Sequence, residues 1–459
     1  MFSNLIAARA QMGTSLVFHI VFSVLGVGLP LMLCIAEGLG LWKKDATWLA
    51  LARQWTKAFA ILFIIGAVSG AIVEFEISLL WPSFTRYSGS VIGLPFAMEG
   101  FAFFTEGIFL GLYLYGVKRL SPFVHWLCSI PLVISGSFSA WFITSANSWM
   151  NSPAGFKIVH GQLVGIDPFQ AMLNPSTPFE TTHMILACYV TIGFATAAVY
   201  AVGMLRGKHN DYHRKGLLLG MLVGTIAIPL QITSGDFNAR FLETAQPAKY
   251  AAMEGVLHSG NGKPLYIGGI VDQNTGNVYY AIQIPHGESL LAHFDLNSHT
   301  VGLDAFPKDD QPNAAVIHLS FDAMVGCGFF MLLVGLVFWF LFFRRKRVIP
   351  EQKWLLWGAA IAGPAVFLAV EFGWITTEEG RQPWIIYGLL RVKDAVNPAQ
   401  WMNVSFSIFS VIYVILGVTL VVLLLRLARS QKPEQTMPAL IKDERTKEGS
   451  QSKQEAGAR

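Results

Sequence analysis

Nine long apolar runs divide the chain, and polar residues gather in the patches between them. The runs cover residues 15–41, 57–80, 92–116, 123–146, 180–205, 215–234, 313–343, 354–376 and 403–428. A helix of about 20 apolar residues crosses a hydrocarbon core of about 30 Å, and every run reaches that length. The pattern predicts an all-α fold, a polytopic transmembrane bundle of about nine helices.

Composition agrees with a membrane protein. Hydrophobic residues make up 53% of the 459 residues and charged residues only 14%, whereas soluble domains carry about 25% charged residues. The formal net charge of +4 comes with basic residues beside alternate loops. Membrane topology therefore explains the charge, and no nucleic-acid partner is indicated.

Basic residues set the orientation. They cluster near residues 43–57, 118–119, 206–215 and 344–353, in or beside alternate loops. Loops rich in Lys and Arg stay in the cytoplasm. Because the number of spans is odd, the N-terminus is predicted outside and the C-terminus in the cytoplasm. The polar tail at 429–459 is predicted to be cytoplasmic and disordered.

Residues 1–428 form one predicted membrane domain with two long external segments. These segments are residues 147–179 and residues 235–312. A loop of that length in a compact bundle usually has a function. The sequence shows no internal repeat of useful period, which disfavours a transporter built from inverted repeats.

Ionisable side chains inside apolar spans are costly, so they are functional candidates. The candidates in or next to the spans are His19, Glu74, Glu76, Glu99, Glu106, His183, Asp322, Glu371 and Glu378. With the predicted topology, His19, His183, Met324 and Glu378 share the outer half of the bilayer. Each histidine is either hydrogen-bonded to another helix or an axial haem ligand. Spacing alone does not decide between these two interpretations.

Glu99 and Glu106 are seven residues apart, so they lie on one face of a helix. Two carboxyl groups stacked along the bilayer normal can pass protons through intervening water. The alternative is a pair of protonated acids that bond to neighbouring helices. We expect the pair to form a proton path from the cytoplasm.

One string near the C-terminus is highly specific, GWITTEEGRQPW at residues 373–384. Further blocks precede it in order. They are PFAMEG at 95–100, FFTE at 103–106, SAWFI at 139–143, ANSWMNSP at 146–153, Thr182-His183 and MVGCG at 324–328. Together these blocks resemble subunit I of the cytochrome bd oxidases, from about residue 19 to about residue 398.

The resemblance implies haem ligands. His183 and Met324 match the axial pair of a low-spin haem b. His19 and Glu378 match the ligands of two high-spin sites, which hold a high-spin haem b and a haem d or third haem b. Which of the two residues binds which haem stays open. Arg381 is expected near a haem propionate or the ligating carboxylate, where a guanidinium stabilises negative charge.

The resemblance also implies proton and quinol sites. Glu99 matches the acid beside the oxygen-reducing site, and Glu106 the acid below it. The segment 235–312 corresponds to the quinol-binding loop, in which Lys249 and Glu254 are implicated in quinol oxidation. A carboxylate that accepts a proton and a cation that binds a ring oxygen suit that chemistry. Without the resemblance, a solvated surface would be the simpler interpretation of these two residues.

The implied protein is the catalytic haem subunit of a terminal respiratory oxidase in a bacterial or archaeal cytoplasmic membrane. It would oxidise quinol at the outer face and reduce O2 to water with cytoplasmic protons, without pumping. Expected partners are membrane lipid and a second polytopic subunit, with or without a small single-helix subunit. Two alternatives are a haem b electron carrier, which would not need Glu378, and a proton-coupled transporter without haem.

Three features depart from the resemblance. Residues 75–82 read FEISLLWP, where many members carry Phe-x-Phe-Gly-x-Asn-Trp. Asp322 lies two residues before Met324, where some members have arginine. An acid there should favour ferric haem over ferrous haem. The external loop has no extension, which indicates the short-loop type.

Overall fold

The computed structural model describes residues 3–399 and 401–430. In that part of the chain, nine helical segments are long and apolar enough to cross a membrane. They are α1 (Asn4–Trp42), α2 (Ala46–Leu80), α3 (Pro82–Gly116), α4 with α5 (Pro122–Leu127, Ser129–Asn151), α7 (Thr177–Leu205), α8 (Asp211–Ala245), α11 (Ala314–Arg344), α12 (Lys353–Gly380) and α14 (Met402–Ser430). The predicted number of spans is confirmed. The tail predicted to be disordered is residues 429–459, and from residue 431 onward it lies outside the described residues.

Polar residues at the helix starts define where several spans begin. The side chain of Ser3 accepts a hydrogen bond from the backbone N–H of Ile6 at the start of α1, and Asp45 accepts one from Thr47 at the start of α2. Such caps satisfy N–H groups that have no partner within the helix. The apolar runs therefore form helices, and polar residues between the runs cap the helix ends.

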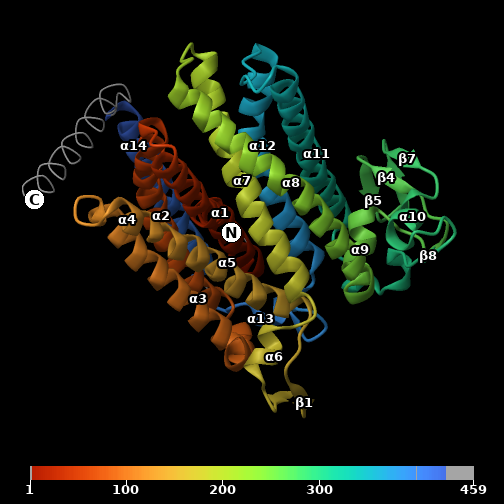
Figure 1. Ribbon diagram of the computed structural model, residues 1–459. Coiled ribbons are helices and arrows are strands. Elements are labelled where there is room, and N and C mark those ends of the chain that lie inside the picture. The colour runs from red at the N-terminus through yellow and green to blue at the C-terminus, as the bar shows by residue number, and fades with distance from the viewer. Residues whose placement is uncertain (1–2, 400, 431–459) are drawn as a thin grey trace, which may run out of the picture.

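Four helices, α7, α8, α11 and α12, lie together in the bundle (Figure 1), and their contacts close into a ring. Each one packs on two others: α7 on α8 and α12, and α11 on the same two helices. Consequently α7 and α11 lie diagonally across the ring. Any side chains that α7 and α11 direct inward face each other.

A second group contains α1, α2, α3 and α5 (Figure 1). Here α1 packs along α2, α3 packs along α5, and both α1 and α5 contact α7, which joins the two groups. Helix α14 packs on the outside of α1 and α2. Its Val411, Val414, Ile415 and Val418 are more than half exposed. In a bilayer, such an apolar surface faces lipid or another subunit.

Helix α8 is longer than its apolar run. The run ends near residue 234, but the helix continues to Ala245, before Pro247 begins α9 (Pro247–Glu254). The apolar run reports the thickness of the membrane rather than the length of the helix. The first eleven residues of the predicted loop are therefore a helical extension of the bundle.

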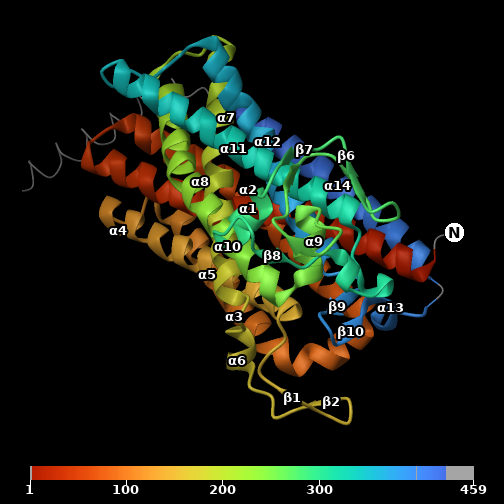
Figure 2. The ribbon, with the colours of Figure 1, turned by 90° about the vertical axis from the view of Figure 1, so that its right-hand side faces the viewer.

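The remaining loop folds into a small module beside α11 (Figure 2). Its strands pair antiparallel as β3 (Gly260–Asn261) with β8 (His299–Thr300), β4 (Leu265–Ile267) with β7 (Ile282–Ile284), and β5 (Ile270–Asp272) with β6 (Asn277–Tyr279). It also contains α10 (Gly287–His293) and the 3-10 turns η1 (Leu303–Ala305) and η2 (Lys308–Asp310). Tyr250, Val271, Leu303 and Ile317 belong to one buried apolar cluster. That cluster fixes the module on the bundle.

Two other connections carry short elements. The connection between α5 and α7 holds β1 (Lys157–Val159), β2 (Gln162–Val164) and α6 (Pro168–Met172). The connection after α12 holds β9 (Trp384–Ile386), β10 (Leu390–Arg391) and α13 (Val392–Ala395). Tyr387 donates its backbone N–H to the carbonyl of Met150 at 2.9 Å. This bond places the two connections at the same end of the bundle.

Candidate functional site

A cavity of about 530 Å³ opens among α1, α2, α3, α5 and the end of α12. Its wall is mostly apolar. Five of the predicted site residues line it: His19, Glu99, Glu106, Glu378 and Arg381. Residues more than 350 positions apart in the sequence therefore share one space, of the size that holds small-molecule ligands and cofactors.

His19 is held by two serines. Ser69 Oγ donates to the Gly66 carbonyl at 3.1 Å, so it can accept the Nδ1 proton of His19 at 2.9 Å. Nε2 then keeps its lone pair and accepts from Ser23 Oγ at 2.8 Å. A β-carbon at Gly70 would lie 3.0 Å from Cε1 of the ring. With the proton on Nδ1, Nε2 is the nitrogen suited to an iron.

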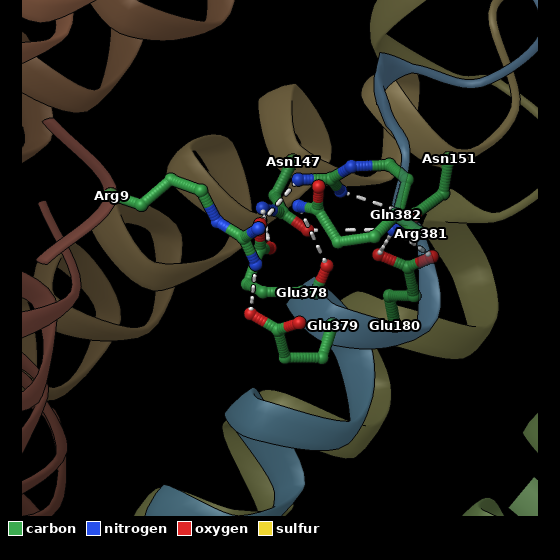
Figure 3. A network of polar contacts seen from close by, with 8 residues as sticks. All are labelled: Arg9, Asn147, Asn151, Glu180, Glu378, Glu379, Arg381 and Gln382. Atoms are coloured by element: carbon green, nitrogen blue, oxygen red, sulfur yellow. Dashed lines mark hydrogen bonds and ion pairs between the residues drawn. The ribbon is translucent and has the colours of Figure 1, made fainter. Parts of the chain in front are cut away.

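Glu378 is held by an amide and a guanidinium (Figure 3). Asn147 Nδ2 donates to Glu378 Oε1 at 2.8 Å, and Arg381 Nη2 donates to Glu378 Oε2. Arg381 Nη1 donates to Asn151 Oδ1 at 3.1 Å. Arg381 is 2% exposed, and its Nε finds no partner among the residues that the structure describes. This spare buried donor suits an anionic group such as a propionate.

The network extends to residues that the sequence did not single out (Figure 3). Asn151 Nδ2 donates to both carboxyl oxygens of Glu180, at 3.0 and 3.1 Å. The Asn151 carbonyl accepts from Gln246 Nε2 at 2.8 Å, and Arg9 pairs with Glu379 at 2.6 Å. Asn151 lies in one of the recognised blocks, and Glu180 lies one turn before His183. These two positions are the only features of the sequence that point to a role for Asn151 and Glu180.

Glu99 and Glu106 both point toward α5. Ser139 Oγ donates to Glu99 Oε1 at 3.1 Å. A β-carbon at Gly136 would lie 3.3 Å from Glu106 Oε1. Glu106 is 4% exposed, and this oxygen has no partner within residues 3–399 and 401–430. Glu74 also lines the cavity. The seven-residue spacing on α3 thus places two acids along one wall.

His183 and Met324 lie on the two diagonal helices of the ring. A β-carbon at Gly235 of α8 would lie 3.2 Å from His183 Cε1, and one at Gly373 of α12 would lie 3.0 Å from Met324 Sδ. Gln231 Nε2 donates to His183 Nε2 at 2.9 Å, while the buried Nδ1 has no partner in the described chain. Gly235 on α8 and Gly373 on α12, the other two helices of the ring, thus leave room beside His183 and Met324.

The surroundings of His183 and Met324 adjoin the cavity that holds His19 and Glu378. Met184, next to His183, and Trp374, next to Gly373, line the cavity that holds His19 and Glu378. The donor types fit haem iron, which takes only one or two axial ligands from the protein. The unpartnered Nε of Arg381 and the glycines beside His183 and Met324 are features expected around such a group.

Lys249 and Glu254 are buried rather than solvated, each 3% exposed. A β-carbon at Gly380 would lie 2.7 Å from Lys249 Cγ, so α9 docks on the end of α12. Burial lowers the pKa of Lys249 to about 8 against the attraction of Glu180. Burial, followed by repulsion from Glu288 and Asp322, raises the pKa of Glu254 well above its usual range. A solvated surface is therefore wrong for both residues.

Asp322 connects the loop module to α11. The backbone N–H of Gly268 donates to Asp322 Oδ2 at 2.5 Å. His318 Nε2 lies 3.4 Å from the same oxygen, and its Nδ1 lies 2.8 Å from the carbonyl of Met253. Asp322, which stands where some members of the family have arginine, thus anchors the loop two residues from Met324.

Comparisons with known proteins cover nearly the whole chain. The family model for cytochrome bd terminal oxidase subunit I matches residues 7–432. A putative cytochrome bd menaquinol oxidase subunit I of Bacillus subtilis is 37% identical over 92% of this chain and 96% of the relative. A cytochrome bd ubiquinol oxidase subunit 1 of the same organism is 34% identical over 92% and 93%. A bd oxidase structure from Geobacillus thermodenitrificans superposes with a TM-score of 0.89 at 35% identity, covering 94% of this chain and 99% of that one.

These matches confirm the resemblance inferred from the sequence blocks. The fold agrees as well, because the solved bd oxidase chain shares the arrangement of helices. The family implies haem cofactors, a multi-pass place in a bacterial membrane and a subunit II as partner. The chain belongs to the cytochrome bd terminal oxidase subunit I family and is an oxidoreductase of aerobic respiration.

Proposed function

We propose that this subunit oxidises a quinol at the outer face of the membrane and reduces O2 to water with protons from the cytoplasm. The cavity that brings His19 and Glu378 together with Glu99 and Glu106 is the observation that carries the proposal. Two candidate ligands and two acids in one buried space suit a reaction that consumes electrons and protons together. The relatives' names, menaquinol oxidase and ubiquinol oxidase, support a quinol as the donor.

His183 and Met324 would hold a low-spin haem b. His19 and Glu378 would hold a high-spin haem b and a haem d or third haem b, in an order left open. When bound, the irons supply one-electron transfer and an open position for O2. Arg381 holds the Glu378 side chain in place, and its spare Nε would bind a propionate.

Glu106 and Glu99 would carry protons to the cavity. Both carboxyl groups line it from α3, and the unpartnered oxygen of Glu106 can accept a hydrogen bond from an entering water. Protons released outside and taken up inside separate charge across the membrane, so no pump is required. This arrangement needs the orientation that the basic residues indicate, with the N-terminus outside and the tail cytoplasmic.

The external loop at 235–312 would be the quinol site within the membrane domain 1–428. Gln246 bonds to Asn151, so the loop lies at the same end of the bundle as the connection between α5 and α7. Lys249 would bind a ring oxygen and Glu254 would accept a proton. A subunit II, with or without a small single-helix subunit, would complete the complex.

A reduced-minus-oxidised absorption spectrum of the purified complex, with and without CO, tests the proposal. We expect low-spin b bands together with a CO-sensitive high-spin signal. A far-red, CO-sensitive band would assign haem d to one high-spin site, whereas b bands alone would assign a third haem b. Assembled complex without any haem signal would contradict the proposed function.

Lys249→Ala is expected to raise the apparent KM for quinol about tenfold or more, the loss typical of a charge-assisted hydrogen bond. Glu254→Ala is expected to lower turnover instead, because the proton acceptor is lost. In the unaltered protein, the pKa of Lys249 near 8 means that its charge disappears as the pH rises through 8, so KM should rise there. The K249A variant should lack this rise.

Steady-state O2 uptake across a quinol titration at several pH values measures these effects. Lys308→Ala is the matched control, since Lys308 is exposed in the same loop. Unchanged KM and turnover in both K249A and E254A would rule out this quinol site.

A further inference from the structure

The interior of the loop module holds a second buried carboxyl group beyond Glu254. Glu288, in the first turn of α10, is 0% exposed. Tyr250 Oη donates to its Oε1 at 2.6 Å, while its Oε2 is buried and has no partner in the part of the chain that the structure describes. Tyr250 and Glu254 are four residues apart on α9, so they share a helix face. Glu288 therefore approaches the face of α9 that carries Glu254.

The two carboxyl groups do not both carry a charge near neutral pH. Burial, followed by the charge of Glu288, raises the pKa of Glu254 well above its usual range. Burial is also the main cause that raises the pKa of Glu288 to about 7; Glu243 adds to the rise, and Tyr250 and His293 oppose it. Like charges in a dry space share a proton rather than both ionise. Of the two groups Glu288 has the lower pKa, so it is the member that releases its proton first as the pH rises.

Glu243 of α8 lies near enough to Glu288 to act on its charge, and it marks the direction from Glu288 toward water. Glu243 Oε1 lies 2.7 Å from His293 Nε2, and the side chains are 16% and 36% exposed. Glu288 itself is fully buried, so exposure increases stepwise from Glu288 to Glu243 to His293. The order of burial gives the route a direction, from the loop interior to the aqueous phase.

Other charged groups near this route have partners of their own. Asp322 faces Glu254 from α11 and accepts from the Gly268 N–H. Arg240 reaches the end of α10 from α8 and is paired with Asp236 at 3.1 Å. Neither group bonds to Glu288 or to His293 among the described contacts.

We propose that Glu288 relays the protons of quinol oxidation, receiving them from Glu254 and passing them through Glu243 and His293 to the outer aqueous phase. The inference rests on the proposed quinol site. Each quinol loses two O–H protons and two electrons and becomes a quinone. The electrons pass to the haem centres and finally to O2, and the protons leave one at a time along the relay. Glu288 acts through Glu254 and does not contact the quinol.

Glu288→Gln in the assembled, membrane-embedded complex tests the relay. Two donors are compared: a short-chain quinol, and tetramethyl-p-phenylenediamine, a one-electron donor that releases no proton when oxidised to its radical cation. We expect kcat with quinol to fall about 100-fold or more, the range of a lost proton-transfer group. KM for quinol should stay within about twofold, and the rate with the second donor should be kept.

The pH profile provides a second readout. In the unaltered complex, kcat with quinol should rise as the pH increases through about 7, where Glu288 ionises. That limb should be absent in E288Q. Glu243→Gln should give a smaller loss with quinol, because water can replace a group nearer the surface. Asp309→Asn, at an exposed position of the same loop, is the matched control and should change neither donor's rate.

Two results would overturn the relay. Full quinol turnover in E288Q would show that protons leave by another route. Equal losses with both donors would place the defect in the haem centres or in folding rather than in proton release. Failure of the unaltered complex to oxidise any quinol, with the second donor still active, would overturn the proposed quinol site and the relay together.

Discussion

Replacing His183 with alanine is expected to remove the low-spin haem signal and to lower quinol oxidation about 100-fold or more. The imidazole would be one of only two protein ligands to that iron. Loss of a residue that merely hydrogen-bonds a metal ligand typically lowers activity about 10- to 100-fold, so loss of the ligand itself should cost at least as much. The alanine also leaves an empty space in the ring formed by α7, α8, α11 and α12. The measurements are the haem-to-protein ratio, the amplitude of the low-spin bands and O2 uptake.

Met324→Leu separates ligation from packing at the same place. Leucine fills a similar volume but lacks the sulfur, so the haem should stay with a lower reduction potential. His209→Ala is the matched control, because His209 lies in the loop after α7, at the far end of that helix from His183, and pairs with Glu351 at 2.9 Å. An unaltered low-spin signal in H183A would refute the assignment of His183.

Glu378→Gln is expected to remove one high-spin haem and to lower O2 reduction about 100-fold or more. Glutamine has nearly the same shape and can still accept from Asn147, so the packing persists while the anionic ligand is lost. Alanine would be a poorer choice, because it removes both oxygens that accept from Asn147 and Arg381 and also leaves a cavity, whereas glutamine keeps one acceptor oxygen and fills the space. The CO difference spectrum and the haem content measure the effect.

Glu379→Gln is the control for this variant. Its carboxylate is one residue away but pairs with Arg9 rather than Arg381. E379Q should keep the full haem content, and unaltered low-spin bands in E378Q would show that the fold persists. Full haem content and full O2 uptake in E378Q would refute Glu378 as a ligand.

The spans could be predicted from sequence because apolar length is a local property. The ends could not, as α8 shows: its polar extension to Ala245 is helical, although the membrane signal stops near residue 234. The acids on α3 could be placed on one face for the same local reason. Their shared wall with α5 depends on Gly136, whose lack of a side chain leaves room for the Glu106 carboxyl group.

The haem-ligand candidates show the limit of pattern-based prediction. Chemistry alone admitted His19, His183 and Met324 as ligands, but only the resemblance paired them. The diagonal placement of α7 and α11, with Gly235 and Gly373 between them, depends on packing between distant segments. The contacts of Asn151 with Glu180 and Arg381, 29 and 230 residues away, follow no local spacing either.

The amide of Asn151 separates two opposite charges. Its oxygen receives Arg381 and its nitrogen serves Glu180, so the amide cannot rotate by half a turn without losing both bonds. The uncharged Asn151 side chain thereby lies between the Glu180 carboxyl group and the Arg381 guanidinium. Because it holds Nη1 of Arg381 while Nη2 bonds to Glu378, Asn151 helps to orient the arginine that positions the candidate ligand.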